Sequence, residues 1–230
     1  SLDIYAGSGL VQLNAPDSSG NPYLIGPITV YSAGSVLTSN LYIKGALTMP
    51  SIPLQLLGSG NQTINTHGYD ISIGSIDMAS GYTGSLNLVA GSSNTISIGA
   101  VGSSGPLTSF SIASSSASNV SLSSVTTTGG DISIDPAATF SGFSNLKATG
   151  GEIYLSSAST SGTVFADGNI NFSSGSAISG TFISGGSISS MGSLVVGGNL
   201  ELTTPSGISI GSSIISSGSY DLTLSSSMSP

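Results

Sequence analysis

Cysteine is absent from this sequence of 230 residues, and basic residues are almost absent. There is no Arg, and the only basic residues are Lys44 and Lys147. Without Cys the chain can form neither disulfides nor thiolate metal sites, and thiol catalysis is excluded. Because 10 acidic residues leave a net charge of -8, the chain cannot neutralise a row of phosphates. We therefore expect neither nucleic acid nor an anionic membrane surface as a partner.

Long apolar runs are absent as well. The sequence has no stretch of about 18 consecutive apolar residues, which is the length that a membrane-spanning helix requires. Its first residues, SLDIYAGSG, lack the basic segment and the apolar stretch of a signal peptide. We expect no membrane insertion, and we interpret the chain as a mature or excised piece.

Charged residues make up only 5% of the chain, against roughly 25% in a typical soluble domain. Together with abundant Ser and Gly, this scarcity can indicate disorder. The apolar share of 38% and the mean hydropathy of +0.36 argue against disorder, because the apolar residues alternate regularly with polar ones. We expect a folded protein whose surface is covered by hydroxyl groups rather than by charges.

Apolar residues recur with a period of two along the chain. Each such pair places two side chains on one face of a β-strand, with a small polar residue between them on the other face. Gly, Ser, Asn and Asp separate the pairs and supply turns. Helical spacing is missing and helix formers are scarce, so we expect almost no helix. The pairs are Ile71 and Ile73, Leu86 and Leu88, Ile96 and Ile98, Phe110 and Ile112, Val120 and Leu122, Ile132 and Ile134, Ile153 and Leu155, Ile170 and Phe172, Leu200 and Leu202, Ile208 and Ile210, and Leu222 and Leu224.

A short motif, the glycine phrase, also repeats along the chain. It consists of two glycines, a polar residue, and then two apolar residues around a polar one. This is one glycine turn followed by one short strand, and a repeat of this kind determines the architecture. The phrase occurs at residues 129–134 (GGDISI), 150–155 (GGEIYL) and 197–202 (GGNLEL), with looser copies at 167–172 (DGNINF), 185–190 (GGSISS) and 69–73 (YDISI).

Two all-β architectures compete for this pattern. Antiparallel sandwiches use tight hairpins such as Asn-Gly, which the sequence lacks. A parallel β-solenoid uses short strands separated by frequent turns and stacks its coils about 4.8 Å apart. The sequence favours a right-handed parallel β-helix with irregular coils of about 17–22 residues, in which glycine phrases fall on more than one face. We expect ten to twelve coils, and hence a rod on the order of 50 Å long.

Residues 1–57 have a different composition from the rest. They contain five of the nine prolines and four of the eight tyrosines, while the alternation of apolar residues persists. We expect a single β-solenoid domain over residues 1–230, in which 1–57 form a less regular portion or a cap for an open end.

The glycine phrases resemble the repeats of the filamentous haemagglutinin family, which are large secreted bacterial adhesins with a right-handed parallel β-helix shaft. The resemblance is clearest over residues 68–224. It implies an extracellular or cell-surface rod that reaches, adheres or assembles, and it implies no catalysis and no cofactor. We expect homo-oligomers or polymers through the solenoid ends, and a host or matrix glycan or protein receptor stays open as a further partner.

The sequence favours structural roles over catalysis or metal binding for its individual polar residues. His67 is the only histidine, so a zinc site or a Ser-His-Asp triad with Asp70 depends on it; we expect a loop residue instead. Asp131 and Glu152 occupy equivalent places in two glycine phrases. Glycoside hydrolysis needs a pair of carboxyl groups, and a carbohydrate-active enzyme would use these two residues as that pair. We interpret them, beside Asn169 and Asn199, as a turn ladder that binds backbone groups.

We therefore expect a structural protein and no enzyme, with no catalytic, cofactor-binding or metal-binding residues. Asp131 and Asp135 flank one strand but form no calcium-loop motif. Thr126, Thr127 and Thr128 are consecutive and alternate faces, unlike the T-x-T arrays of ice-binding solenoids. A ligand-binding solenoid, for glycan or ice, stays open as the alternative function, and a carbohydrate-active enzyme is the third candidate.

Overall fold

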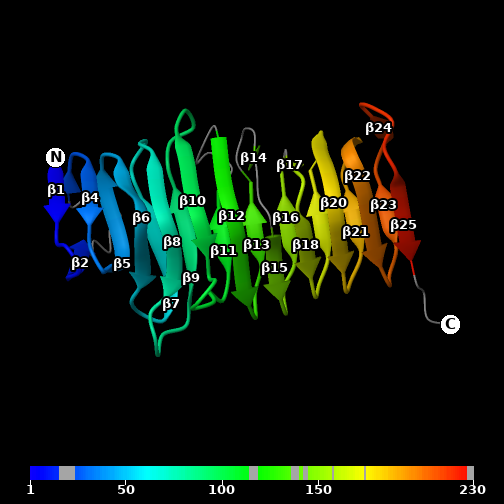
Figure 1. The fold of residues 1–230 in the computed structure, drawn as a ribbon. Coiled ribbons are helices and arrows are strands. Elements are labelled where there is room, and N and C mark those ends of the chain that lie inside the picture. Colours follow the sequence, from blue (N-terminus) through cyan, green and yellow to red (C-terminus); the bar gives the residue numbers. More distant parts are fainter. Residues whose placement is uncertain are drawn as a thin grey trace.

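The computed structural model describes residues 1–15, 24–113, 119–135, 140–141, 145–156, 158–173 and 175–226. Within these ranges the chain forms 25 strands and no helix, which confirms the all-β class (Figure 1). The strands are β1 Leu2–Tyr5, β2 Leu10–Ala15, β3 Leu24–Ile25, β4 Ile28–Ser32, β5 Ser35–Lys44, β6 Leu47–Leu56, β7 Gly60–Asn65, β8 Ile71–Met78, β9 Gly84–Val89, β10 Thr95–Val101, β11 Phe110–Ile112, β12 Asn119–Thr128, β13 Ile132–Ile134, β14 Phe140–Ser141, β15 Asn145–Thr149, β16 Ile153–Leu155, β17 Ala158–Thr160, β18 Thr163–Ala166, β19 Ile170–Phe172, β20 Ser176–Ser184, β21 Ile188–Ser190, β22 Leu194–Thr204, β23 Ile208–Ile210, β24 Ile214–Ser216 and β25 Leu222–Ser226.

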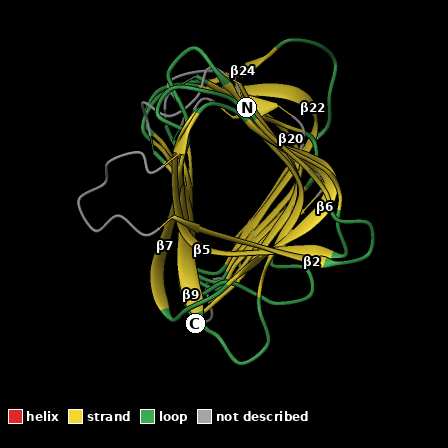
Figure 2. Cartoon of the chain, turned by 90° about the vertical axis from the view of Figure 1, so that its left-hand side faces the viewer, coloured by secondary structure: helices red, strands yellow, loops and turns green. Residues whose placement is uncertain are grey.

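Every strand pairing in the described residues is parallel, and the strands stack into a β-solenoid of about nine turns. Viewed along its axis the solenoid is a closed ring with three faces, and the two termini lie at opposite ends (Figures 1 and 2). The first face contains β4, β14 and β17, and the second contains β15, β18 and β25. Long strands such as β8, β12 and β20 bend from the first face onto the second. The third face stacks β7, β9, β11, β13, β16, β19, β21 and β23 in that order.

The coils are of two lengths. In the C-terminal half Ile153, Ile170, Ile188 and Ile208 pair in succession, so these coils contain 17, 18 and 20 residues, as expected. In the N-terminal half Leu47, Ile71, Ile96 and Val120 follow one another after 24, 25 and 24 residues. Longer coils leave fewer of them in the chain, so the expectation of ten to twelve coils is wrong. About nine coils correspond to a rod of roughly 40 Å.

Residues 1–57 form strands that pair directly with the coils that follow. β4 pairs with β6, and β6 pairs with β8, so the parallel ladder passes through this region without a break. Between Met49 and Pro53 the register of β6 against β8 shifts by two residues, because β6 uses two more residues than β8 to turn this corner. Proline suits such a place because it lacks a backbone donor. Pro16, Pro22 and Tyr23 lie outside the described residues.

The interior consists of apolar columns that run along the axis. One column of the third face contains Leu86, Phe110, Ile132, Ile153, Ile170 and Ile188, each at most 1% exposed. Both members of nine of the eleven predicted pairs are buried, which confirms the alternation as an inward-facing pattern. The exceptions are the last two pairs: Ile208 and Ile210 are only partly buried, and Leu222 and Leu224 are exposed.

The glycine phrases do fall on more than one face. Those at 129–134, 150–155, 167–172 and 185–190 stack on one another on the third face, whereas GGNLEL lies within β22 at the corner between the first and second faces. The stacked phrases require glycine for a physical reason. Gly150 adopts a positive φ of 76°, and a Cβ on Gly151 would lie 2.1 Å from the carbonyl oxygen of Gly130 in the coil below.

Candidate functional site

A polar ladder runs along the edge where the third face begins. An Asp131 oxygen accepts a hydrogen bond from the backbone N–H of Glu152 at 2.8 Å. In a later coil, an Asn169 oxygen accepts from the backbone N–H of Ser187 at 2.8 Å and from its hydroxyl at 2.9 Å. Each side chain therefore satisfies a donor of the next coil at the turn. This confirms the turn-ladder interpretation for Asp131 and Asn169, whereas the Glu152 carboxylate accepts from side chains instead of backbone groups.

The same device recurs elsewhere in the solenoid. Asp70 accepts from the backbone N–H of Thr95 at 2.7 Å, and Asn40 accepts from that of Thr63 at 2.8 Å. Asn199, in β22, accepts from the backbone N–H of Asp221 at 3.2 Å, as the turn-ladder interpretation predicts. Its phrase occupies a different corner from that of Asn169.

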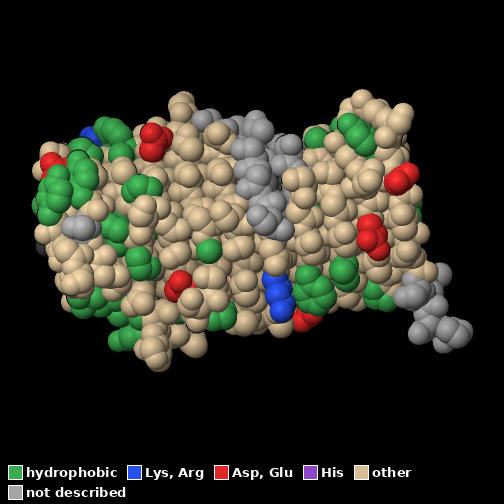
Figure 3. Space-filling model, viewed as in Figure 1, with side chains coloured by type: hydrophobic (Ala, Val, Ile, Leu, Met, Phe, Trp, Pro, Cys, Tyr) green, Lys and Arg blue, Asp and Glu red, His purple; other side chains and the backbone are tan. Residues whose placement is uncertain are grey.

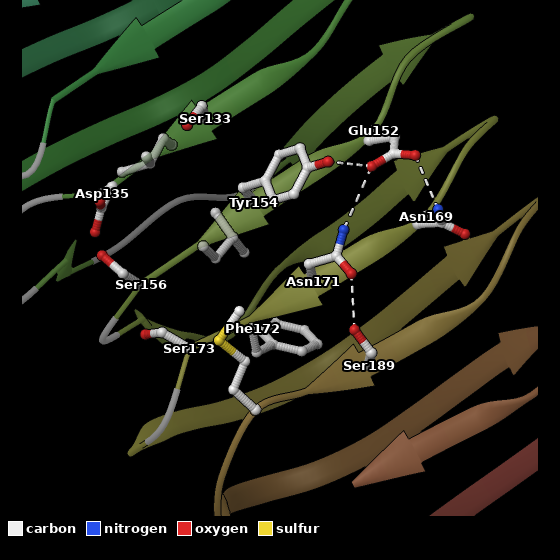
Figure 4. Close-up of a pocket in the computed structure, with 13 residues that line it drawn as sticks. Ser133, Asp135, Glu152, Tyr154, Ser156, Asn169, Asn171, Phe172, Ser173 and Ser189 are labelled. Carbon is white, nitrogen blue, oxygen red and sulfur yellow. Dashed lines mark hydrogen bonds between the residues drawn. The ribbon is translucent and has the colours of Figure 1, made fainter. Parts of the chain in front are cut away.

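Glu152 collects side-chain donors from three positions around it. The Tyr154 hydroxyl, two residues along the same strand, donates to one carboxylate oxygen. The Asn169 amide donates to the other oxygen at 2.8 Å, and the Asn171 amide approaches the first at 3.5 Å. The Asn171 oxygen in turn accepts from the Ser189 hydroxyl at 2.7 Å. The network therefore spans three consecutive coils, at β16, β19 and β21 (Figure 4).

The carboxylate of Glu152 changes the chemistry of Tyr154. The hydrogen bond that Tyr154 donates to Glu152 raises the pKa of the phenol to about 12, with smaller contributions from burial and from the negative charges of Glu152 and Asp131. Loss of the proton would place two negative charges side by side. Tyr154 therefore remains a neutral donor at physiological pH, and the pair holds a fixed geometry.

These residues line a groove of about 580 Å³ on the outside of the third face. Its floor follows the outward positions of β13, β16, β19 and β21, which are Ser133, Tyr154, Asn171 and Ser189. Figure 4 shows Glu152 and Asn169 along one side and Asp135, Ser156 and Ser173 along the other. None of its described lining residues is basic. Among the described residues, this groove brings together an aromatic ring, carboxylates and amides, and it is the candidate site.

The other residues singled out from the sequence are spread over the solenoid. His67 lies in the turn between β7 and β8, as expected, where its backbone N–H donates to Asn65 at 2.8 Å. Asp135 is exposed and follows β13. Within the ranges that the structure describes, no three or more His, Asp or Glu side chains gather as metal ligands. No helix of the described chain is long and apolar enough to cross a membrane.

The three consecutive threonines alternate faces as expected. Thr127 is fully buried, and its hydroxyl donates to the carbonyl oxygen of Gly130 at 2.9 Å. Thr126 is half-buried and Thr128 is exposed. Thr126 and Thr128 therefore face outward together, but Thr126 pairs with Lys147 in the next coil, so the T-x-T pair is not repeated there.

The groove is a feature that the sequence pattern did not predict. The pattern identifies Asp131 and Glu152 as equivalent, but it does not single out Tyr154, Asn171 and Ser189 as a set. The available signal is their shared place, because each directly follows the first apolar residue of its phrase, which is Ile153, Ile170 or Ile188. Aligning the phrases by those apolar residues places all three in one outward column.

No protein-family model matches the chain, and neither the curated proteins nor the solved structures provide a match. The resemblance to haemagglutinin-like adhesins therefore depends on the glycine phrases alone. The structure supports the coarser statement that this chain is a β-solenoid repeat protein.

Proposed function

We propose that the chain is a structural segment of an extracellular fibre or adhesin, which projects from the cell surface or assembles end to end. The main support is the exposure of apolar side chains in the last described coil. Leu202 is fully buried and pairs in register with Phe182, whereas Leu224, the next residue of the same column, is 48% exposed. Ile214 and Leu222 at the same end are also exposed.

The opposite end of the rod offers a matching surface. Leu2 and Leu10, in the strands β1 and β2 of the first coil, are 44% and 61% exposed. Among the described residues, β1 pairs with β4 alone and β25 with β22 alone, and a further parallel strand can pair with the outer side of such strands. Contact between unlike ends does not close on itself, so repeated association of copies produces a filament.

The sides of the rod suit a structural role outside cells. On the face drawn in Figure 3, most of the surface is uncharged and polar, with scattered acidic groups and isolated apolar patches. Little on such a surface titrates or is screened by salt, so the shape and solubility of the rod should change little with ionic strength or pH. In this proposal the protein extends and connects, and it catalyses no reaction.

Sedimentation velocity and negative-stain electron microscopy over a range of protein concentrations test end-to-end assembly. We expect single rods at low concentration and linear oligomers at high concentration. The double variant Leu222→Lys, Leu224→Lys places two charges on the C-terminal end, where edge lysines oppose strand addition. We expect it to remain monomeric.

The matched control is Ile183→Lys, because Ile183 is 37% exposed but lies on the side of the rod in β20. This control should assemble like the unmodified chain. Compact monomers at every concentration, or equal assembly of the end variant and the unmodified chain, would contradict the proposal. Antibody labelling of intact and permeabilised source cells tests the extracellular location separately.

A further inference from the structure

We propose that the groove on the third face binds a neutral saccharide, which lies along the rod axis across β13, β16, β19 and β21. The groove combines three features that sugar recognition needs: a projecting aromatic ring, fixed hydrogen-bonding groups around it, and an uncharged or acidic lining. This binding activity goes beyond the proposed structural role, because a rod needs no groove in order to extend.

The aromatic wall is Tyr154. It is 42% exposed and lies in an outward column between Ser133 and Asn171. Both neighbours in the adjacent coils are therefore smaller than the tyrosine ring. Its hydroxyl is held by Glu152, which orients the ring along its own strand (Figure 4). A ring of this kind offers an apolar surface to the C–H face of a sugar while its polar end remains hydrogen-bonded.

The polar groups of the groove are arranged before any ligand arrives. Glu152 is held by Tyr154 and Asn169, and Asn171 is held by Ser189. A carboxylate can accept about four hydrogen bonds, so Glu152 retains capacity for a sugar hydroxyl beyond its side-chain donors. Because these side chains are already ordered, binding a ligand costs little further conformational entropy.

Charge selects the class of sugar. Glu152 and Asp135 both line the groove, while the two lysines of the chain lie elsewhere, in β5 and β15. An acidic sugar would bring a third carboxylate into this surface with no cation to offset it. Neutral sugars carry hydroxyl donors that match carboxylate and amide acceptors. The exposed Met191 adds apolar surface at the end of the groove.

An array of neutral and acidic oligosaccharides, followed by calorimetry with the best neutral ligand, tests the inference on the full chain. We expect binding to neutral oligosaccharides and none to uronic-acid or sialylated ones. Tyr154→Ala should weaken binding about fivefold to tenfold, the amount that one aromatic contact contributes. Tyr154→Phe keeps the ring and should retain most of the affinity.

Tyr69→Ala is the matched control, because Tyr69 is 43% exposed but lies in the turn before β8, outside the groove. It should bind like the unmodified chain, and circular dichroism should show that each variant is folded. Absence of binding to every neutral oligosaccharide would overturn the inference. Preferential binding of acidic sugars, or equal losses in Tyr154→Ala and Tyr69→Ala, would overturn it too. The outcome is independent of end-to-end assembly, which the variants of Leu222 and Leu224 test.

Discussion

The interior coils and the last coil of this solenoid contain the same kinds of residue in the same pattern, yet they differ in burial. Leu202 and Leu224 occupy successive places in one column, but Leu202 is fully buried and Leu224 is 48% exposed. The difference arises because each coil is covered by the next, and Leu224 has no described coil beyond it. Burial in a solenoid is therefore a property of the stack rather than of the strand.

The prediction with the largest expected effect shortens the leucine side chain at both places to alanine. Leu202→Ala should lower the free energy of unfolding by about 2–5 kcal/mol, because it leaves a cavity between packed coils. Leu224→Ala should change the free energy of unfolding by less than about 1 kcal/mol. Urea titrations followed by circular dichroism measure both values. Equal losses would mean that the last coil is covered as well as the interior ones.

The second test concerns the contact between coils at the glycine turns. In Gly151→Ala the new Cβ would lie 2.1 Å from the carbonyl oxygen of Gly130, so one coil must move away from the other. We expect a loss of about 1–3 kcal/mol in the free energy of unfolding. A Cβ added to Gly197 would meet no other atom within 4 Å, and Gly197→Ala should remain within about 0.5 kcal/mol of the unmodified chain. Denaturant titrations of the two variants measure the difference.

A smaller effect is expected from the polar ladder. Asp131→Ala removes the acceptor of the Glu152 backbone N–H in an interior coil, and should cost about 1 kcal/mol. Asn199→Ala removes a longer contact, 3.2 Å, to Asp221 in the exposed last coil, where water can replace the lost acceptor. Thermal melting of the two variants side by side measures the difference. A larger loss for Asn199→Ala would contradict the comparison.

The smallest effect at neutral pH concerns Tyr154, whose pKa is raised from 10.0 to about 12 by its hydrogen bond to Glu152. Because the folded chain holds this proton more tightly than the unfolded chain, the stabilisation is fully present below pH 10 and is lost as the pH rises to about 12. Ultraviolet titration of the unmodified chain minus that of Tyr154→Phe isolates this ionisation. Glu152→Gln should lower the pKa of Tyr154, and an unchanged titration would exclude Glu152 as the cause.

The sequence was sufficient for the class of fold and for most of the core. The alternation of Ile153 with Leu155, or of Ile170 with Phe172, identifies inward positions whatever the neighbouring strand is. The length of the coils was harder to predict. Residues 24–113 contain the same apolar pairs as the later part, but the segments between those pairs are longer, and nothing in the pairs alone states which of them stack.

The groove was beyond prediction for a related reason. Glu152, Asn171 and Ser189 are far apart in the chain, and they meet only because β16, β19 and β21 lie in register. A shift of one residue would turn Tyr154 and Asn171 inward. The equivalence of Asp131 and Glu152 could be read from their phrases, whereas the turn of Tyr154 toward Glu152 depends on the side chains beside it.

The sequence by itself determined that this chain forms short parallel strands with apolar interiors, hydroxyl-rich exteriors and glycine turns, because period-two alternation and turn formation are local properties. Only the tertiary structure decided the number of coils, the corner that each glycine phrase occupies, and the place of Tyr154 beside Glu152. These features depend on which strand lies above which, and that is fixed by the summed packing of whole coils rather than by any single segment.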